Sequence, residues 1–120
     1  INHDKNKNFI VWGSGYQMRD FIHIKDVVRG SLLISKKVKN GKAVNLSSGK
    51  FLSFIKLSKK ILNMLGKKNI SIFGNSTKPE GVFARGGSVS LQKKFGFKPK
   101  ISIEKGIKYA IEYFKQNHSK

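Results

Sequence analysis

A formal charge of +19 over 120 residues is the strongest compositional signal in this sequence, with 25 lysines and arginines against six acids. The length and an apolar content of 38% suit one domain, and such a domain buries roughly 65% of its unfolded surface. Cysteine is absent and the three histidines are scattered, which excludes disulfides and thiolate metal sites and predicts no bound metal. No apolar run approaches the length of a membrane-spanning helix, so we expect no membrane partner.

The positive charge has two interpretations. A strongly basic chain attracts polyanions, and a small nucleic-acid-binding protein is therefore one hypothesis. However, only Arg19, Arg29 and Arg85 are arginine, and the lysines are spread along the chain in pairs. This distribution favours a compositional background over a nucleic-acid surface, so a nucleic-acid partner is the weaker interpretation.

The first third of the chain predicts two strands and a helix. Residues 1–8 are polar and without periodicity, which indicates a loop. The apolar run at 9–12 predicts a short buried strand, followed by a glycine turn. Residues 21–24 predict a second strand, after which Asp26 is expected to cap a helix.

The remainder continues the alternation of strands and helices. Residues 43–46 predict a third strand, and Ser53 is a suitable N-cap for a helix over 54–65 that ends at Gly66. Residues 70–73 predict a fourth strand. The sequence therefore predicts an α/β fold.

A long loop and two further helices complete the expected elements. Residues 74–88 hold glycines and a proline that interrupt any strand, and long loops in compact domains are often functional. A short helix is predicted over 89–95, and Ser102 is expected to cap the last helix.

Several catalytic and cofactor motifs are missing. No G-x-G-x-x-G stands between a strand and a helix, so no dinucleotide-binding loop is assigned. No G-x-S-x-G is present, and six acids make paired catalytic carboxylates improbable on composition. We assign no catalytic residue.

The two arginines outside the first helix suit an anionic ligand. Arg19 offers a planar set of donors that matches two oxygens of a phosphate; its alternative role is a salt bridge to Asp20 or Asp26. Arg85 lies in the glycine-rich loop, where backbone approaches a ligand closely, or else it is simply solvated.

Trp12 and His23 are the remaining candidates. Trp12 ends the first strand and is expected either in the core or as a flat wall for a base or sugar. His23 stands in an apolar stretch, where a lone histidine is a structural residue, and we assign it no catalytic role.

Four stretches carry a resemblance: VWGSGYQMRDFIHIKDVV, AVNLSSG, STKPEGVFAR and FGFKPKISIEKGIKYAIEYF. Their order and spacing resemble the C-terminal part of extended short-chain dehydrogenases that act on nucleotide sugars. Trp12 in VWGSG and the KPEG loop are similar to the GDP-L-fucose synthase branch of that family. The resemblance runs from about Phe9 to Phe114.

The resemblance implies a C-terminal substrate-binding domain over residues 1–120, with short strands, about four helices and no Rossmann core. Trp12 and Arg19 fall on substrate contacts of the family, and Arg85 on a basic position near the diphosphate. The implied role is the GDP-sugar-binding part of an NADP-dependent epimerase-reductase. A UDP- or CDP-sugar 4-epimerase or dehydratase is the alternative within the family.

The resemblance places NADP and the catalytic groups in an N-terminal Rossmann domain before Ile1, either as the rest of a longer enzyme or as a part lost from a truncated gene product. It implies a homodimer for the complete enzyme and a cytoplasmic location. Two departures stand out: Ser88 replaces an acidic residue of the family pattern, and a basic substrate contact falls at Asn69 or Ile70.

Overall fold

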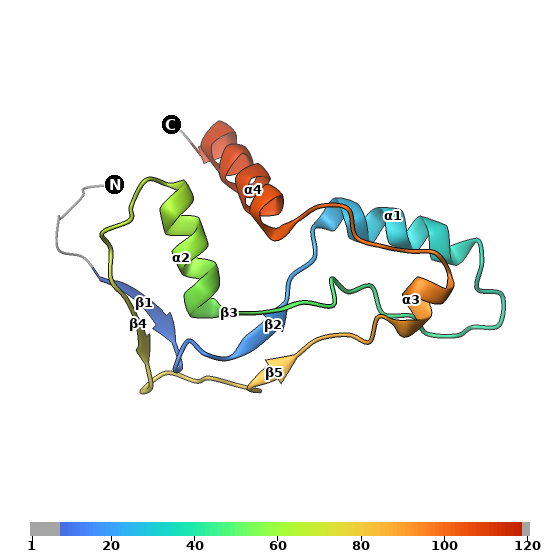
Figure 1. The fold of residues 1–120 in the computed structure, drawn as a ribbon, viewed down its shortest axis with the longest axis horizontal. Coiled ribbons are helices and arrows are strands. Elements are labelled where there is room, and N and C mark those ends of the chain that lie inside the picture. Colours follow the sequence, from blue (N-terminus) through green and yellow to red (C-terminus); the bar gives the residue numbers. More distant parts are fainter. Residues whose placement is uncertain (1–7, 119–120) are drawn as a thin grey trace. The chain divides into compact units, whose positions relative to one another are not determined.

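The computed structural model describes residues 8–118 (Figure 1). Apart from residue 8, the loop expected over residues 1–8 lies outside them. The elements are β1 (Phe9–Trp12), β2 (Met18–Asp20), α1 (Ile24–Ser35), β3 (Phe51–Ser53), α2 (Phe54–Met64), β4 (Ile72–Asn75), β5 (Ala84–Arg85), α3 (Ser90–Lys94) and α4 (Ile103–His118). The α/β prediction, with short strands and four helices over the described residues, is confirmed.

The chain divides into two compact units. Unit 1 runs to Arg19 and resumes over Phe51–Arg85, and unit 2 takes Asp20–Lys50 and the residues from Gly86 on. The described part of unit 1 holds β1, β4, β3, β5, α2 and most of β2, whereas unit 2 holds α1, α3 and α4. One domain over residues 1–120 stays a prediction.

Unit 1 contains two small sheets. In the first, β1 pairs in parallel with β4, with Phe9 opposite Ile72 and Trp12 opposite Asn75. In the second, the strand order is β3-β2-β5. The predicted strand at 9–12 is confirmed, but the expectation that it is buried is wrong, since Trp12 is 62% exposed.

Helix α2 follows the predicted capping closely. The Ser53 hydroxyl accepts a hydrogen bond from the Lys56 amide at 3.3 Å, which satisfies one free donor of the first turn. Gly66 has a φ of +74° just beyond the helix, and the Lys67 amide donates to the Leu62 carbonyl at 2.8 Å. This is the left-handed glycine termination that the sequence predicts.

The start of unit 2 differs from the sequence prediction. No strand forms over 21–24, and the second strand is Met18–Asp20 instead. His23, not Asp26, is the N-cap of α1: its Nδ1 accepts from the Lys25 amide at 3.2 Å. Asp26 lies in the first turn and is buried, because its carboxylate binds a different part of unit 2.

The third expected strand, at 43–46, is also wrong, since these residues form no strand and β3 lies at 51–53. Just after this segment, the Gln92 side chain makes the backbone hydrogen bonds that a neighbouring strand would make. The Gln92 amide accepts from the Ser47 N–H and donates to the Ser47 carbonyl, both at 2.8 Å. Gln92 is only 1% exposed, so this pairing is part of the core of unit 2.

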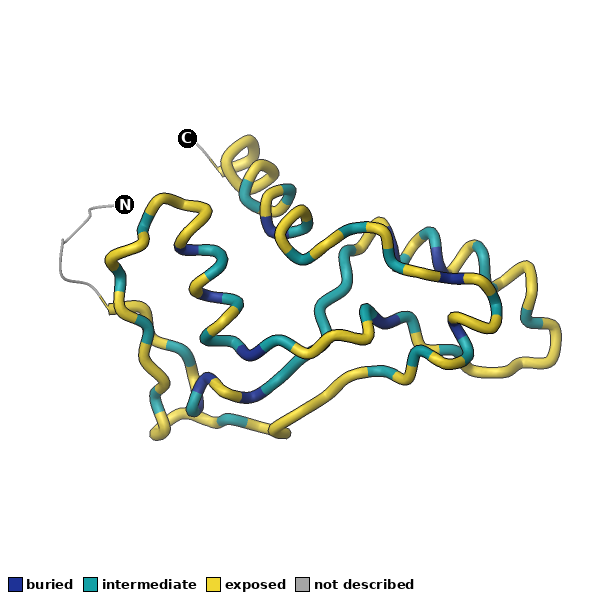
Figure 2. Tube along the Cα trace, viewed as in Figure 1, coloured by how far each residue is buried: buried dark blue, intermediate teal, exposed yellow. Residues whose placement is uncertain are grey.

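The remaining predictions hold with small shifts. The fourth strand is Ile72–Asn75 rather than 70–73, and the long loop contains the two-residue strand β5. Helix α3 agrees with the expected 89–95 helix, and the Ser102 hydroxyl accepts from the Lys105 amide at the start of α4. Figure 2 shows how few positions of each unit are fully buried; the apolar ones are Leu62, Phe97 and Ile107. Within residues 8–118 no helix is long and apolar enough to cross a membrane.

Candidate functional site

The pairing of β2 with β5 brings two predicted site residues together. The strands are parallel, with Met18 opposite Ala84 and Arg19 opposite Arg85. Residues in register on neighbouring parallel strands project from the same face of the sheet, about 5 Å apart along the hydrogen-bonding direction. Like charges placed opposite each other are unfavourable, so the pair favours an anion that both can contact.

Arg19 is held by backbone carbonyls rather than by a carboxylate. Its Nη1 donates to the carbonyls of Met18 at 2.7 Å and Val82 at 2.9 Å, and its guanidinium carbon lies 5.7 Å from the centre of the Phe54 ring. Because both acceptors are neutral carbonyls, they do not compensate the positive charge of the Arg19 guanidinium. The alternative of a salt bridge to Asp20 or Asp26 is wrong, because among the described residues those carboxylates bind other partners.

Arg85 is exposed at the end of β5. Within residues 8–118 its side chain takes part in no hydrogen bond or ion pair. The strand pairing places its backbone opposite Arg19, but no hydrogen bond within residues 8–118 fixes its guanidinium as two carbonyls fix that of Arg19. The two arginines therefore combine one fixed and one adaptable guanidinium.

Trp12 lies on the surface of unit 1. Its side chain is 62% exposed, so the core role is wrong and the wall role remains. The Trp12 carbonyl accepts from Gln17 Nε2 at 2.8 Å, and Lys78 Nζ lies 5.7 Å from the centre of the indole ring. Gln17 is buried, and its Oε1 is a buried acceptor without a partner in the described structure.

The glycine turn after Trp12 is fastened to the long loop by Glu80. Ser14 donates to this carboxylate from its hydroxyl at 2.5 Å and from its amide at 3.3 Å. Gly13 has a φ of +71°, and a Cβ built on it would lie 2.8 Å from Glu80 Cβ, so no other residue fits there. The sequence predicts no individual role for Glu80 or Lys78, although both stand in the KPEG loop and an acid is rare in this chain.

Asp20, the last residue of β2, orders the serine-glycine turn of unit 2. Its carboxylate accepts from the hydroxyls of Ser47 and Ser48 and from the amides of Ser48, at 2.8 Å, and Gly49, at 2.9 Å. Desolvation is the largest influence and raises the pKa of Asp20, but these donors together bring the pKa below its ordinary value. The Asp20 carboxylate therefore has a structural role, because it holds this turn in place.

Two positions that depart from the family pattern, Ser88 and Asn69, are both exposed. The Ser88 hydroxyl pairs with the hydroxyl of Ser90 at 3.3 Å, at the start of α3. Asn69 is exposed in the turn before β4. His23 caps α1 and meets Tyr109 edge to face at 5.6 Å, in keeping with the structural role predicted for it.

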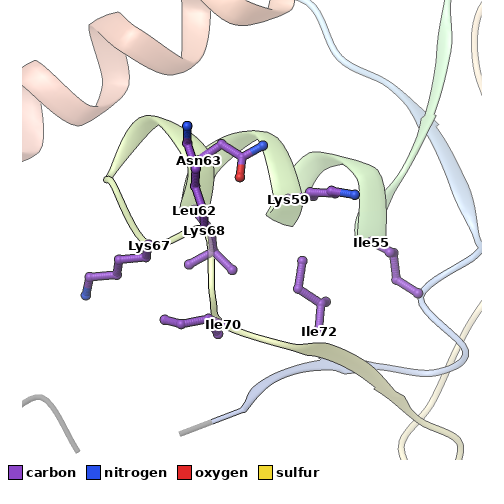
Figure 3. Close-up of a pocket in the computed structure, with 8 residues that line it drawn as sticks. All are labelled: Ile55, Lys59, Leu62, Asn63, Lys67, Lys68, Ile70 and Ile72. Carbon is purple, nitrogen blue, oxygen red and sulfur yellow. The ribbon is translucent and has the colours of Figure 1, made fainter. Parts of the chain in front are cut away.

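A separate pocket of about 310 Å³ lies between α2 and β4 in unit 1 (Figure 3). Four aliphatic side chains form its apolar part, with lysines and one asparagine around them; the lining residues are Ile55, Lys59, Leu62, Asn63, Lys67, Lys68, Ile70 and Ile72. Ile70 is the only position of the predicted family contacts that it includes. In the described part of the chain no group of acids and histidines is arranged to hold a metal ion.

Comparison with known proteins identifies enzymes to which this chain is similar. Residues 1–47 match the NAD dependent epimerase/dehydratase family. A GDP-L-fucose synthase of Sinorhizobium fredii is 30% identical over 107 residues, which cover 89% of this chain and 34% of the relative. A putative UDP-glucose 4-epimerase of Methanocaldococcus jannaschii is 30% identical over 114 residues, covering 95% of this chain and 36% of the relative.

Solved epimerases share the fold. The UDP-glucose 4-epimerase of Thermotoga maritima, crystallised with UDP-glucose, has a TM-score of 0.80 and 26% identity over 93% of this chain and 36% of its own. The resemblance to epimerases and dehydratases of nucleotide sugars is therefore confirmed. The chain spans about a third of the length of the curated relatives it matches.

Proposed function

We propose that this chain is the nucleotide-sugar-binding part of an epimerase-reductase resembling GDP-L-fucose synthase, with a GDP-sugar as its ligand. The observation that carries the proposal is the register of β2 and β5, which sets Arg19 beside Arg85. Neither guanidinium has a carboxylate partner within residues 8–118. A diphosphate supplies the negative charge and the paired oxygens that such a pair requires.

Each residue has a distinct task in this proposal. Arg19, fixed by two carbonyls, presents its remaining N–H donors to one phosphate. Arg85, exposed on the neighbouring strand, contacts the same diphosphate. Trp12 offers an exposed indole face on which a base or sugar ring packs. The roles are binding and orientation, and the chemical step belongs to other groups.

NADP is proposed as the cofactor of the complete enzyme, bound by an N-terminal Rossmann domain. The described residues do not fit a dinucleotide, because the Gly13–Gly15 turn leads into β2 and not into a helix N-terminus. The relatives are about three times longer than this chain, which supports a separate cofactor segment.

Calorimetric titration with GDP tests the proposal on three variants. Arg19→Ala removes the fixed guanidinium, and we expect affinity to fall at least about tenfold, the effect of losing a charge-assisted contact. Arg19→Lys keeps the charge but not the planar donors, so it should recover only part of the loss. Lys42→Ala, an exposed change of equal charge in unit 2, is the control.

Two outcomes would contradict the proposal. Equal GDP affinity for wild type and Arg19→Ala would exclude a phosphate contact at Arg19. A loss of GDP affinity of the same size in Lys42→Ala would show that the effect of Arg19→Ala comes from net charge alone. Circular dichroism of each variant ensures that a loss of affinity does not reflect a loss of fold.

A UDP- or CDP-sugar epimerase or dehydratase is the second candidate, favoured by the similarity to UDP-glucose 4-epimerases. The phosphate contacts would be the same and the base contacts would differ. Competition of GDP, UDP and CDP for one site separates the two, and preference for UDP would assign this alternative.

Nucleic-acid binding remains the hypothesis from another class, motivated by the charge of +19. It predicts binding of oligonucleotides whose affinity falls steeply with salt and is unaffected by GDP. Displacement of an oligonucleotide by GDP, or no oligonucleotide binding at 150 mM salt, about physiological, would exclude it.

A further inference from the structure

Lys78 covers the exposed indole that the proposed function assigns to the ligand. Its Nζ lies 5.7 Å from the centre of the Trp12 ring, within the range of a cation–π contact. In the described part of the chain no carboxylate pairs with Lys78. An unpaired ammonium therefore lies directly beside the proposed binding wall.

Hydrogen bonds on both sides of Lys78 fix the backbone segment that carries it. The Asn75 carbonyl accepts from the amides of Gly13 and Lys78, each at 3.0 Å, which closes a turn at the end of β4. Two residues after Lys78, the Glu80 carboxylate binds the amide and hydroxyl of Ser14. The short segment that carries Lys78 is thus attached to the Trp12 turn at both ends.

The same loop continues to the arginine pair. A Cβ built on Gly81 would lie 3.9 Å from Arg19 Nη2, and the next carbonyl, that of Val82, accepts from Arg19 Nη1. The loop then enters β5, where Arg85 lies opposite Arg19. One continuous segment of unit 1 therefore carries Lys78 and Arg85 and, between them, contacts Arg19.

We propose that Lys78 is a third cation of this site and recognises the phosphates of a nucleoside diphosphate. The inference rests on the proposed function. A lysine ammonium on its flexible stem acts as a point charge that reaches a phosphate without a fixed geometry. When a ring of the ligand packs on Trp12, the ammonium leaves the indole face and contacts the phosphate, so Lys78 discriminates phosphorylated from unphosphorylated ligands.

Titration of the 120-residue chain with GDP and with guanosine tests this role. Trp12 is the only tryptophan, so its fluorescence reports the site, and calorimetry gives an independent affinity. Lys78→Met should weaken GDP binding about two- to fivefold, as expected for an exposed charge pair, and leave guanosine binding unchanged. Lys78→Arg should retain GDP affinity, and Lys42→Met is the charge-matched control.

The outcomes separate this inference from the proposed function. If Arg19→Ala weakens GDP binding and Lys78→Met behaves like Lys42→Met, the role of Lys78 is overturned and the proposed function stands. Tighter GDP binding by Lys78→Met would show that Lys78 only obstructs the indole, which also overturns it. If wild type does not bind GDP, or Arg19→Ala binds it equally well, the proposed function itself fails.

Discussion

The two units differ in how their arginines are paired. In unit 2 the carboxylate of Asp26 accepts from Arg29 Nη2 at 2.8 Å and from the amides of Lys100 and Ile101 at 2.9 and 2.8 Å. In unit 1, Arg19 and Arg85 have no such carboxylate partner within the described residues. Charges that are satisfied inside a unit stabilise its fold, whereas charges left without a partner are available to a ligand.

Arginine illustrates the contrast most directly. Arg29 of unit 2 binds Asp26 and the Lys98 carbonyl, and its guanidinium carbon lies 4.9 Å from the centre of the buried Phe97 ring. Arg85 of unit 1 makes no side-chain contact of this kind in the described structure. The rarity of arginine in a lysine-rich chain is therefore informative only when the partners of each arginine are known.

The largest effect is expected from removing the carboxylate of Asp26. Asp26→Ala leaves Arg29 and two backbone amides without their acceptor, and it should lower the free energy of unfolding by about 2–4 kcal/mol. Urea denaturation measures the loss. Glu112→Ala is the control, because Glu112 is exposed and lies 3.9 Å from Lys108, so it should cost under about 0.5 kcal/mol. Equal losses in both variants would contradict the conclusion that the paired carboxylate of Asp26 stabilises unit 2.

A smaller effect is expected from filling space in the same unit. A Cβ on Gly30 of α1 would lie 2.8 Å from both Leu46 Cδ2 and Phe97 Cε2. Since Phe97 is 1% exposed, its ring lies in the packed interior of unit 2, and Gly30→Ala should cost about 1–3 kcal/mol.

Gly106→Ala in α4 is the matched control for this prediction. Its Cβ would meet His23 Cδ2 at 3.4 Å, near ordinary contact, so the gain in helix propensity should stabilise the chain by about 0.5–1 kcal/mol. A gain for both variants in urea denaturation would show that unit 2 is loosely packed around Gly30.

The pH dependence of stability should come from the carboxylates of unit 2. Desolvation raises the pKa of Asp26, but Arg29 and the amides of Ile101 and Lys100 outweigh it and bring the pKa below its ordinary value. The unfolded state then takes up protons first. The contribution is therefore complete above the ordinary pKa of about 4 and is lost as the pH falls through the lower folded value.

Urea denaturation between pH 7 and pH 3, a range set by the ordinary carboxyl pKa of about 4, measures this dependence. The stability difference between wild type and Asp26→Asn should shrink as the solution becomes acidic. A difference that is constant over the whole range would exclude Asp26 as the titrating group.

The sequence was sufficient wherever the deciding interaction is local. Ser53 and Ser102 each accept from an amide three residues later, in the first turn of the helix that follows, and Gly66 ends α2 through its own backbone. It was insufficient where distant groups compete for one residue. The sequence predicts Asp26 as an N-cap, but its carboxylate accepts from amides more than seventy residues later. His23 caps α1 instead.

The site divides in the same way. Residue type alone singled out Trp12, Arg19 and Arg85, but their neighbours depend on strand register and loop contacts. The register opposite Arg85 and the bond of Glu80 to Ser14 join residues more than sixty positions apart. No periodicity or local propensity encodes such pairs, which explains why Lys78 and Glu80 were missed.

The smallest effect on stability is expected at Arg85. An exposed side chain without protein partners contributes little to folding, so Arg85→Ala should change the free energy of unfolding by under about 0.5 kcal/mol. Arg29→Ala should cost about 1–2 kcal/mol, because it removes the partner of a buried carboxylate. In calorimetry with GDP the order should reverse, with Arg85→Ala losing affinity and the folded Arg29→Ala retaining it. Retained affinity in Arg85→Ala would mean that an unpaired arginine in unit 1 is merely solvated, and the contrast between the units would then be one of exposure and not of function.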